Sequence, residues 1–338
     1  MLTVDVHNHF APAEILAAAR AGDGVDGLRV EPVDGREFVV HRQGFRWPLQ
    51  PAFHDQRARL SAMDARGIDT AVVSLAPPLM MHWLTDLGAA ADLARLSNDA
   101  LAAFTAGTGG RLTGVATLPM QDPAAAVTEL RRAVTGLGLR GAQIGPRVED
   151  TPLDDPGLRP VLAEAARLRV PLLLHPYHPG TRPGFERFYL TNLVGNPLES
   201  TVGAAHLIFG GVLDELPGLT PVLMHGGGYL PYQIGRLDHG HRVRREASGC
   251  AHPPSHYLRR FHYDTLTHAP GPLRFLAGMV GADRIVYGTD FPYDMGGGTL
   301  AQQLDGTGLG EPEMRLIAGG NASRLFAPAT EAGRARPS

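Results

Sequence analysis

Two histidines near the start of the chain have the spacing of metal ligands. His7 and His9 are separated by one residue, at the end of the apolar run that begins with Leu2. Side chains two apart on a β-strand point to the same side, so both imidazoles can converge on one ion. Histidines at this spacing also arise by chance, and the pair alone leaves both interpretations open.

Three later apolar runs also lead to residues that can bind metals. Two of the runs end directly on His175 and His225, and a third reaches Asp290 after two intervening residues. Catalytic groups of parallel barrels lie at such strand ends, whereas the interior of a barrel demands apolar residues. A buried structural histidine could explain any one position, but it explains all of them together poorly.

The types of these residues predict the chemistry of the site. The three imidazoles of His7, His9 and His175 with the carboxylate of Asp290 suit one divalent ion. We expect Zn²⁺, with Mn²⁺ as the alternative, and a coordination position left open for water or substrate. Such an ion can activate a bound water or polarise a substrate oxygen. His225 is left over, and we expect it to act as a general acid or base beside the metal.

The elements that must position these residues alternate along the chain. Candidate strands are Leu2–Val6, Thr70–Ser74, Leu112–Thr117, Gly141–Ile144, Pro171–Leu174, Pro221–Met224, Phe261–Asp264 and Arg284–Tyr287. Amphipathic stretches between them include Asp55–Arg66, Ala89–Ala106, Ala124–Gly136 and Pro156–Arg169. Eight strands, each followed by a helical stretch, predict an α/β protein with a (β/α)₈ TIM barrel. No GxGxxG follows the first strand, which argues against a dinucleotide-binding fold.

Two insertions interrupt this alternation. Residues 11–55 follow the first strand, and Asp34-Gly35 predicts a hairpin within them. Residues 177–200 follow the fifth strand. Loops at the carboxyl ends of barrel strands overhang the active face, so both insertions are candidate lids. We therefore expect one barrel domain over residues 1–326 and a flexible tail over 327–338.

Composition excludes several classes of function. The net charge is −3 without any block of like charge, so nucleic acid and membrane are not expected as partners. All 31 basic residues are arginine, which excludes Schiff-base lysines, P-loop lysines and a carbamylated lysine between two metals. The one cysteine excludes an internal disulfide and cysteine-rich zinc sites. We expect a soluble cytoplasmic protein.

The spaced motifs together resemble the amidohydrolase superfamily, in its decarboxylase-rich branch. The motifs are His7-x-His9, His175-Pro176, His225-Gly-Gly-Gly and Gly288-Thr-Asp290-Phe-Pro292, with supporting segments at Gly44-Phe-Arg46, 63–69, 118–122, 253–257 and 320–322. The resemblance covers nearly the whole chain. The set is specific for the branch and much less specific for the substrate.

This resemblance implies a single metal, usually zinc, bound by the residues that match His7, His9, His175 and Asp290. It implies that the residue matching His225 acts on water or substrate. It also implies that Arg46 and Arg236 bind substrate carboxylates, with Arg236 supplied by the neighbouring subunit of a homodimer. A guanidinium binds a carboxylate through two parallel hydrogen bonds, so these roles are chemically reasonable.

One departure from the family pattern concerns the residues after His175. The chain has Pro176-Tyr177-His178 where the enzymes it most resembles carry Trp and Asp after the proline. His178 is therefore a candidate substrate contact, although a solvated loop histidine is equally consistent with the sequence.

The leading functional hypothesis is non-oxidative decarboxylation of a small unsaturated or aromatic carboxylic acid, by a carbon–carbon lyase. The alternative is a hydrolase or hydratase that acts on an amide, a lactone or a ring-cleavage product at the same site. A non-catalytic barrel is a third hypothesis, but the presence of His225 beside a complete ligand set argues against it.

Overall fold

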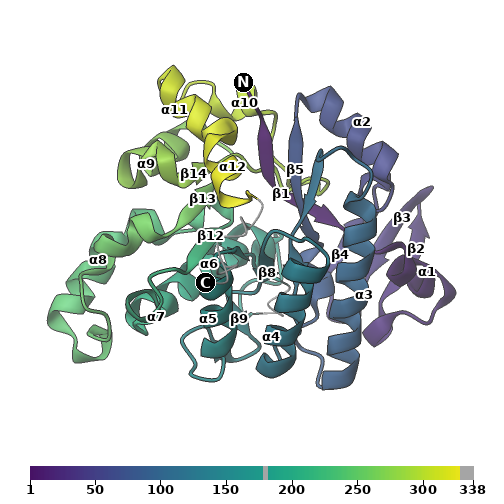
Figure 1. The fold of residues 1–338 in the computed structure, drawn as a ribbon, viewed down its shortest axis with the longest axis horizontal. Helices are drawn as coiled ribbons and strands as arrows, with labels where there is room; N and C mark the ends of the chain where they lie inside the picture. The colour runs from purple at the N-terminus through teal and green to yellow at the C-terminus, as the bar shows by residue number, and fades with distance from the viewer. Residues whose placement is uncertain (178–181, 328–338) are drawn as a thin grey trace, which may run out of the picture.

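Eight parallel strands form a closed barrel at the centre of the molecule (Figure 1). The structure is a computed structural model that describes residues 1–177 and 182–327. The barrel strands are β1 (Val4–Phe10), β5 (Thr70–Leu75), β6 (Leu112–Gly114) continued by β7 (Ala116–Thr117), β8 (Ala142–Ile144), β11 (Pro171–Leu174), β12 (Thr220–Leu223), β13 (His262–Asp264) and β14 (Ile285–Val286). Each of the eight predicted strands is present, and the predicted barrel is confirmed.

The barrel closes between its first and last strands. Neighbouring strands pair in the order β1, β5, β6–β7, β8, β11, β12, β13 and β14. The Val6 amide donates to the Tyr287 carbonyl at 2.9 Å, and the His9 amide donates to the Phe291 carbonyl at 2.8 Å. These bonds join β1 to the segment that follows β14, so the sheet has no free edge there.

Alternating side chains along the strands divide the core into two layers. Residues that point inward form a cluster within the barrel, including Val6, Val72, Leu173, Val222 and Val286. Their strand neighbours point outward and pack with the surrounding helices in a second, larger cluster. Successive side chains of a strand point to opposite faces of the sheet. Because both faces are buried here, the strands are apolar at nearly every position.

Helices surround the barrel (Figure 1). They are α1 (Ala13–Ala21), α2 (Gln56–Arg66), α3 (Leu87–Thr105), α4 (Pro123–Arg131), α5 (Arg159–Leu168), α6 (Asn196–Phe209), α7 (Val212–Glu215), α8 (Leu230–Val243), α9 (Pro270–Val280), α10 (Leu300–Leu304), α11 (Glu311–Arg315) and α12 (Asn321–Leu325). Asp55, Asp86 and Asp122 accept hydrogen bonds from backbone amides at the starts of α2, α3 and α4. These aspartates stabilise the first turns, which have no intrahelical partners for their amides.

The first insertion forms a small antiparallel sheet outside the barrel. Its strands are β2 (Arg29–Val33), β3 (Arg36–Val40) and β4 (Arg46–Pro48), and a further two-stranded ribbon pairs β9 (Arg147–Val148) with β10 (Thr151–Pro152). The predicted hairpin is confirmed: β2 pairs with β3 around Asp34 and Gly35, whose φ angles are 50° and 75°. Two positive φ values match the twist of a tight hairpin turn.

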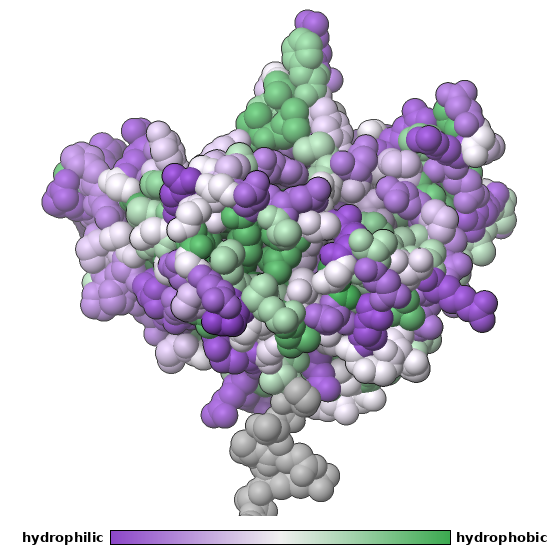
Figure 2. Space-filling model, turned by 90° about the horizontal axis from the view of Figure 1, so that it is seen from above, coloured by the Kyte–Doolittle hydropathy of each residue, from purple (hydrophilic) through white to green (hydrophobic). Residues whose placement is uncertain are grey.

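The described residues contain no helix with the length and apolar character needed to cross a lipid bilayer. Figure 2 shows one face of the molecule, on which hydrophilic residues dominate both sides and a smaller group of hydrophobic residues lies near the middle.

Candidate metal centre

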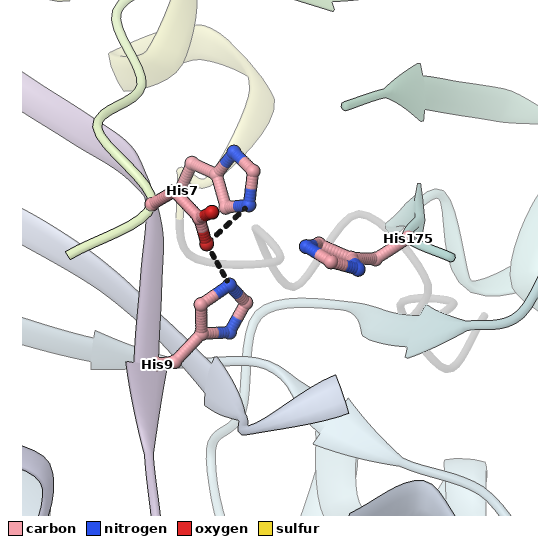
Figure 3. A group of neighbouring side chains, drawn as sticks. His7, His9 and His175 are labelled. Carbon is pink, nitrogen blue, oxygen red and sulfur yellow. Dashed lines mark ion pairs between the residues drawn. The ribbon is translucent and has the colours of Figure 1, made fainter. Parts of the chain in front are cut away.

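Four side chains from three separate parts of the barrel converge at one point. The candidate ligand atoms of His7, His9, His175 and Asp290 all lie within 4.8 Å of one another, and all four residues are buried. Figure 3 shows His7 and His9 projecting from β1 while His175 faces them from across the barrel mouth. Both histidines of β1 lie inside the strand, because pairing with β5 continues to Phe10 rather than ending at Val6 as the sequence suggested.

Hydrogen bonds to the Nδ1 atoms orient all three imidazoles in the same sense. Nδ1 of His7 donates to Asp264 Oδ2 at 2.6 Å, and Nδ1 of His175 donates to the Pro176 carbonyl at 2.6 Å. Nδ1 of His9 lies 3.1 Å from Ser74 Oγ, whose own proton is donated to Gln143. Each ring therefore carries a proton on Nδ1, which leaves Nε2 as the atom directed at the centre of the cluster.

The atoms at the centre have no hydrogen-bond partners of their own. Nε2 of His7 and of His9 lies 3.3 and 2.9 Å from Asp290 Oδ1. None of these atoms, nor Nε2 of His175, forms a hydrogen bond of acceptable geometry within the described residues. Buried polar atoms without partners are rare in folded proteins. Their convergence on one point, with three nitrogens and one oxygen, fits a divalent cation.

The electrostatics of the cluster favour a positive charge at its centre. Burial alone would lower the pKa of His7, but Asp290 and Asp264 raise it to about 10. Burial lowers the pKa of His9 to about 4, and burial beside His7 lowers the pKa of His175 well below its usual value. Burial opposes ionisation of Asp290, yet His7 and His9 hold its pKa well below the ordinary range. Asp290 is therefore ionised, as a carboxyl group must be to bind a metal.

Asp264, at the end of β13, connects the metal cluster to the loop of His225. It is fully buried, binds Nδ1 of His7 and accepts the amide of Gly226 at 2.7 Å. Asp5 supports the opposite side of the cluster, since it accepts the backbone and hydroxyl of Thr289 at 3.1 and 2.5 Å. These two carboxylates position the segments that carry His7 and Asp290.

Arg59 holds the strand that carries His9. This arginine of α2 is completely buried, and it donates to the Ala52 carbonyl and to Asn8 Oδ1, both at 3.0 Å. A third hydrogen bond reaches the carbonyl of His9 itself. The guanidinium also lies 4.9 Å from the ring of Phe291. Arg59 thus contacts both β1 and the segment after β14, the two parts of the chain that meet where the barrel closes.

His225 lies beside the metal cluster on a tightly turned loop. Its ring centroid is 5.3 Å from that of His7 and 5.1 Å from that of His175. The backbone is left-handed at His225 and at the three glycines after it. A Cβ atom at Gly228 would lie 2.0 Å from the Pro197 carbonyl, so glycine is required there. Burial lowers the pKa of His225, which keeps the imidazole neutral near pH 7.

Two cavities open onto the cluster, and Asp290 and Met295 line both of them. The first, which we call the His225 cavity, has a volume of about 620 Å³ and runs along α8 and α9. The second, the Arg46 cavity, has a volume of about 500 Å³ and also includes His175. Residues of both insertions line the Arg46 cavity, and the role of these insertions as lids stays a prediction. Such volumes are typical of small-molecule sites.

The three residues predicted to contact substrate differ in their relation to the two cavities. Arg46 lies on β4 at the wall of the Arg46 cavity, with its guanidinium 4.2 Å from the ring of Phe38. Arg236 lies on an exposed part of α8 and does not line either cavity of its own chain. His178 lies outside the described residues.

Sequence reasoning missed three residues of this site. Asp264 was counted only as the end of a strand, although its position follows the same strand-end rule as His175. Arg59 belongs to an amphipathic helix, where an arginine ordinarily faces solvent. Tyr293, which lines the Arg46 cavity, follows Asp290 in the loop after the last strand and had no motif to mark it.

The chain belongs to the amidohydrolase family, as the match of residues 4–327 to the family model "Amidohydrolase" shows. The resemblance found from the motifs is thereby confirmed. A curated relative is 2-amino-3-carboxymuconate-6-semialdehyde decarboxylase of Dictyostelium discoideum, 33% identical over 271 residues, which are 79% of this chain and 75% of that protein.

Two solved decarboxylases with bound aromatic compounds have a similar fold. A 2,6-dihydroxybenzoate decarboxylase complexed with 2,6-dihydroxybenzoate has a TM-score of 0.78 and 30% identity, covering 96% of this chain and 99% of the other. A dihydroxybenzoic acid decarboxylase from Polaromonas, solved with bound manganese and 2-nitroresorcinol, has a TM-score of 0.74 and 27% identity over 96% of both chains.

Proposed function

We propose that this protein is a metal-dependent carboxy-lyase that removes CO₂, without oxidation, from a small aromatic or unsaturated carboxylic acid. The observation that carries the proposal is the convergence of His7, His9, His175 and Asp290 beside His225. The relatives support it, because they are decarboxylases that share both the fold and most of the chain.

The roles of the residues follow from their positions. His7, His9, His175 and Asp290 would hold one divalent ion, and this ion when bound supplies positive charge that polarises a substrate oxygen. Decarboxylation breaks the bond between the carboxylate carbon and its neighbour, and the electron pair stays with the neighbouring carbon. That carbon then takes a proton while CO₂ leaves. His225 is the unligated imidazole at the cluster, and in our proposal it moves this proton.

Arg46 and Arg236 complete the proposal as carboxylate-binding residues. Arg46 acts from the wall of its own cavity. Arg236 is exposed on α8, whose Pro231 and Tyr232 line the His225 cavity, so a second subunit packed on this face would place an Arg236 near the neighbouring site. We therefore propose a homodimer. His178 remains a proposed substrate contact because in the sequence it directly follows His175, Pro176 and Tyr177, which line the Arg46 cavity.

Zinc is our first choice of metal because three imidazoles and one carboxylate suit it. Manganese is the alternative, and it is the metal bound in the Polaromonas enzyme. We also propose a cytoplasmic location, which cell fractionation tests directly.

The deciding experiment measures metal content and product formation together. The purified protein is loaded with Zn²⁺ or Mn²⁺ and assayed for CO₂ release from hydroxybenzoates and carboxylated muconates. Decarboxylation in D₂O places one deuterium on the carbon that lost CO₂, whereas a hydrolase incorporates oxygen from H₂¹⁸O. Metal binding without CO₂ release, but with ¹⁸O incorporation, would refute the lyase proposal in favour of hydrolysis or hydration.

The homodimer has a separate test by subunit complementation. The variants Arg236→Ala and His225→Asn are each expected to lose most activity. In a mixed dimer, one site combines an intact His225 with an intact Arg236 from the other subunit. Random exchange of subunits should then restore about a quarter of the wild-type activity. Absence of any recovery in verified mixed dimers would contradict the transfer of Arg236 between subunits.

A further inference from the structure

A buried carboxylate of the first insertion contacts residues behind the wall of the Arg46 cavity. It belongs to Asp26, whose side chain is only 9% exposed. Nε1 of Trp83 donates to Asp26 Oδ2 at 2.7 Å, and Nε2 of His41 lies 3.2 Å from the same oxygen. The exposed guanidinium of Arg42 contacts Oδ1. None of these four residues lines either cavity, so none touches a ligand there directly.

Two pairs of stacked rings connect this carboxylate to the cavity. His41 stacks on Phe45, with ring centroids 4.6 Å apart and an angle of 5° between the rings. Trp83 stacks on Tyr177 in the same way, at 6.1 Å and 28°. Phe45 and Tyr177 both line the Arg46 cavity, and they belong to the two different insertions. One carboxylate therefore supports two lining residues from separate segments of the chain.

The hydrogen bonding of His41 directs a ring proton at Asp26. Nδ1 of His41 accepts the amide of Gln43 at 3.2 Å, so this nitrogen carries no proton. Burial lowers the pKa of His41, which keeps the imidazole neutral near pH 7. The single ring proton is then on Nε2, the nitrogen that faces the carboxylate. This contact is electrostatic, because its geometry is not that of a hydrogen bond, whereas Trp83 donates directly.

The backbone around Asp26 fixes the direction in which its carboxylate points. The φ angle of Asp26 is 52°, in the left-handed region that residues other than glycine seldom occupy. Glycine adopts this region freely, and asparagine and aspartate tolerate it better than other side chains. The turn is also closely packed, since a Cβ atom on Gly24 would lie 2.0 Å from the carbonyl oxygen of Leu28. The carboxylate is thus oriented by its own turn as well as by its partners.

We propose that Asp26 is a positioning residue for substrate binding, because it holds the aromatic wall of the Arg46 cavity in the arrangement that receives a planar acid. Without the carboxylate, the indole N–H of Trp83 loses its partner, and the ring that stacks on Tyr177 is less restrained. A wall that is ordered before binding spares the ligand the cost of ordering it. This inference rests on the proposed function, since it requires that the substrate binds in the Arg46 cavity.

The first measurement needs no ligand. Trp47 and Trp83 are the two tryptophans of the chain, so labelling with 5-fluorotryptophan gives two ¹⁹F signals, which Trp83→Phe assigns. Asp26→Gly removes the carboxylate and suits the left-handed backbone. We expect this variant to shift the Trp83 signal and to speed hydrogen exchange of the backbone amides of residues 41–47 about tenfold. Asp26→Asn keeps a neutral acceptor for the indole, so its changes should be smaller.

The second measurement is affinity. Isothermal titration calorimetry on the Zn²⁺-loaded protein uses 2,6-dihydroxybenzoate, the acid bound in the solved relative, as the probe. If the ordered wall falls to about a tenth of the molecules in Asp26→Gly, the apparent affinity falls about tenfold, and Asp26→Asn should recover part of it. Zn²⁺ affinity in chelator competition should stay within about twofold, since Asp26 does not orient a candidate ligand. Glu37→Gln is the matched control, because it breaks an ion pair with Arg20 in the same insertion, and it should change neither affinity.

A double variant checks that Asp26 acts through Trp83. Trp83→Phe keeps the ring and removes the N–H, so it should weaken the probe, and Asp26→Gly combined with Trp83→Phe should bind no more weakly than Asp26→Gly alone. An unchanged probe affinity in Asp26→Gly would overturn the inference, and so would an equal loss in Glu37→Gln or a parallel loss of Zn²⁺ affinity. If the probe affinity falls as expected but the wild type releases CO₂ from no acid, the decarboxylase proposal fails and the positioning role of Asp26 stands.

Discussion

Arg59 offers the most direct test of how the metal site is supported. The change Arg59→Met keeps a long apolar side chain of similar reach and removes the guanidinium. Three acceptors then lose their donor: the carbonyls of Ala52 and His9 and the side chain of Asn8. All three lie within or directly beside the first barrel strand and its insertion. The substitution therefore acts on the backbone that carries His9, without replacing the side chain of any candidate metal ligand.

The size of the effect follows from these contacts. Each buried acceptor left unsatisfied costs about 1–3 kcal/mol, and the loss is partly offset because a buried cation no longer has to be desolvated. We expect Arg59→Met to lower the free energy of unfolding by roughly 3–5 kcal/mol. This is a large fraction of the ~5–15 kcal/mol that stabilises a typical domain.

Urea denaturation of the metal-free protein measures this loss, and chelator competition measures metal affinity in the variant. Arg59→Lys is the control: it keeps the charge but cannot form all three hydrogen bonds, so its stability should fall between the other two. A loss below about 1 kcal/mol for Arg59→Met, with the slope of the denaturation curve unchanged, would refute the assigned role.

Three further predictions follow from the site and its surroundings. Asp264→Asn keeps the shape of the side chain that orients His7, and we expect it to weaken metal binding about 10–100-fold in chelator competition; unchanged affinity would contradict the role of Asp264. Burial lowers the pKa of His82 from 6.5 to about 4. Between these two pH values His82 is protonated in the unfolded chain but not in the folded one, so the free energy of unfolding falls as the pH drops from 6.5 to about 4. The wild-type protein should therefore lose about 2 kcal/mol more unfolding free energy between pH 7 and pH 5 than the variant His82→Leu. If the urea midpoints of both proteins shift equally between these pH values, His82 is not the cause. Removing the metal with a chelator should abolish CO₂ release and lower the melting temperature, and added Zn²⁺ or Mn²⁺ should restore both.

The barrel was predictable because each of its strands corresponds to a short apolar run in the sequence. Such runs are buried on both faces, and their ends necessarily meet at one edge of a parallel sheet. The same rule predicts that His175 and Asp290 lie close together. The extension of β1 to Phe10 was not predictable, since it depends on continued pairing with β5.

The supporting residues were beyond sequence reasoning for a different reason. Arg59 and Asp264 are charged residues that support metal ligands far away along the chain: Arg59 lies 50 positions from His9, and Asp264 lies 257 positions from His7. Nothing in the local sequence distinguishes a buried arginine in α2 from a solvated one. The assignment of individual roles to His225, Arg46 and Arg236 stays a prediction until the variants are measured.

The closure of the barrel has a consequence for how the protein is made. His7 and His9 belong to the first strand, and Asp290 follows the last one, so a bound cation would link two segments separated by most of the chain. A growing polypeptide on the ribosome lacks this carboxylate until the last barrel strand, β14, has been synthesised. The complete ligand set would then bind its ion only after the barrel strands have formed. The bound ion would also slow any unfolding that begins with the separation of β1 from the segment after β14. The loop closed by such a link is long, and closing a long loop removes much of the conformational freedom of the unfolded chain.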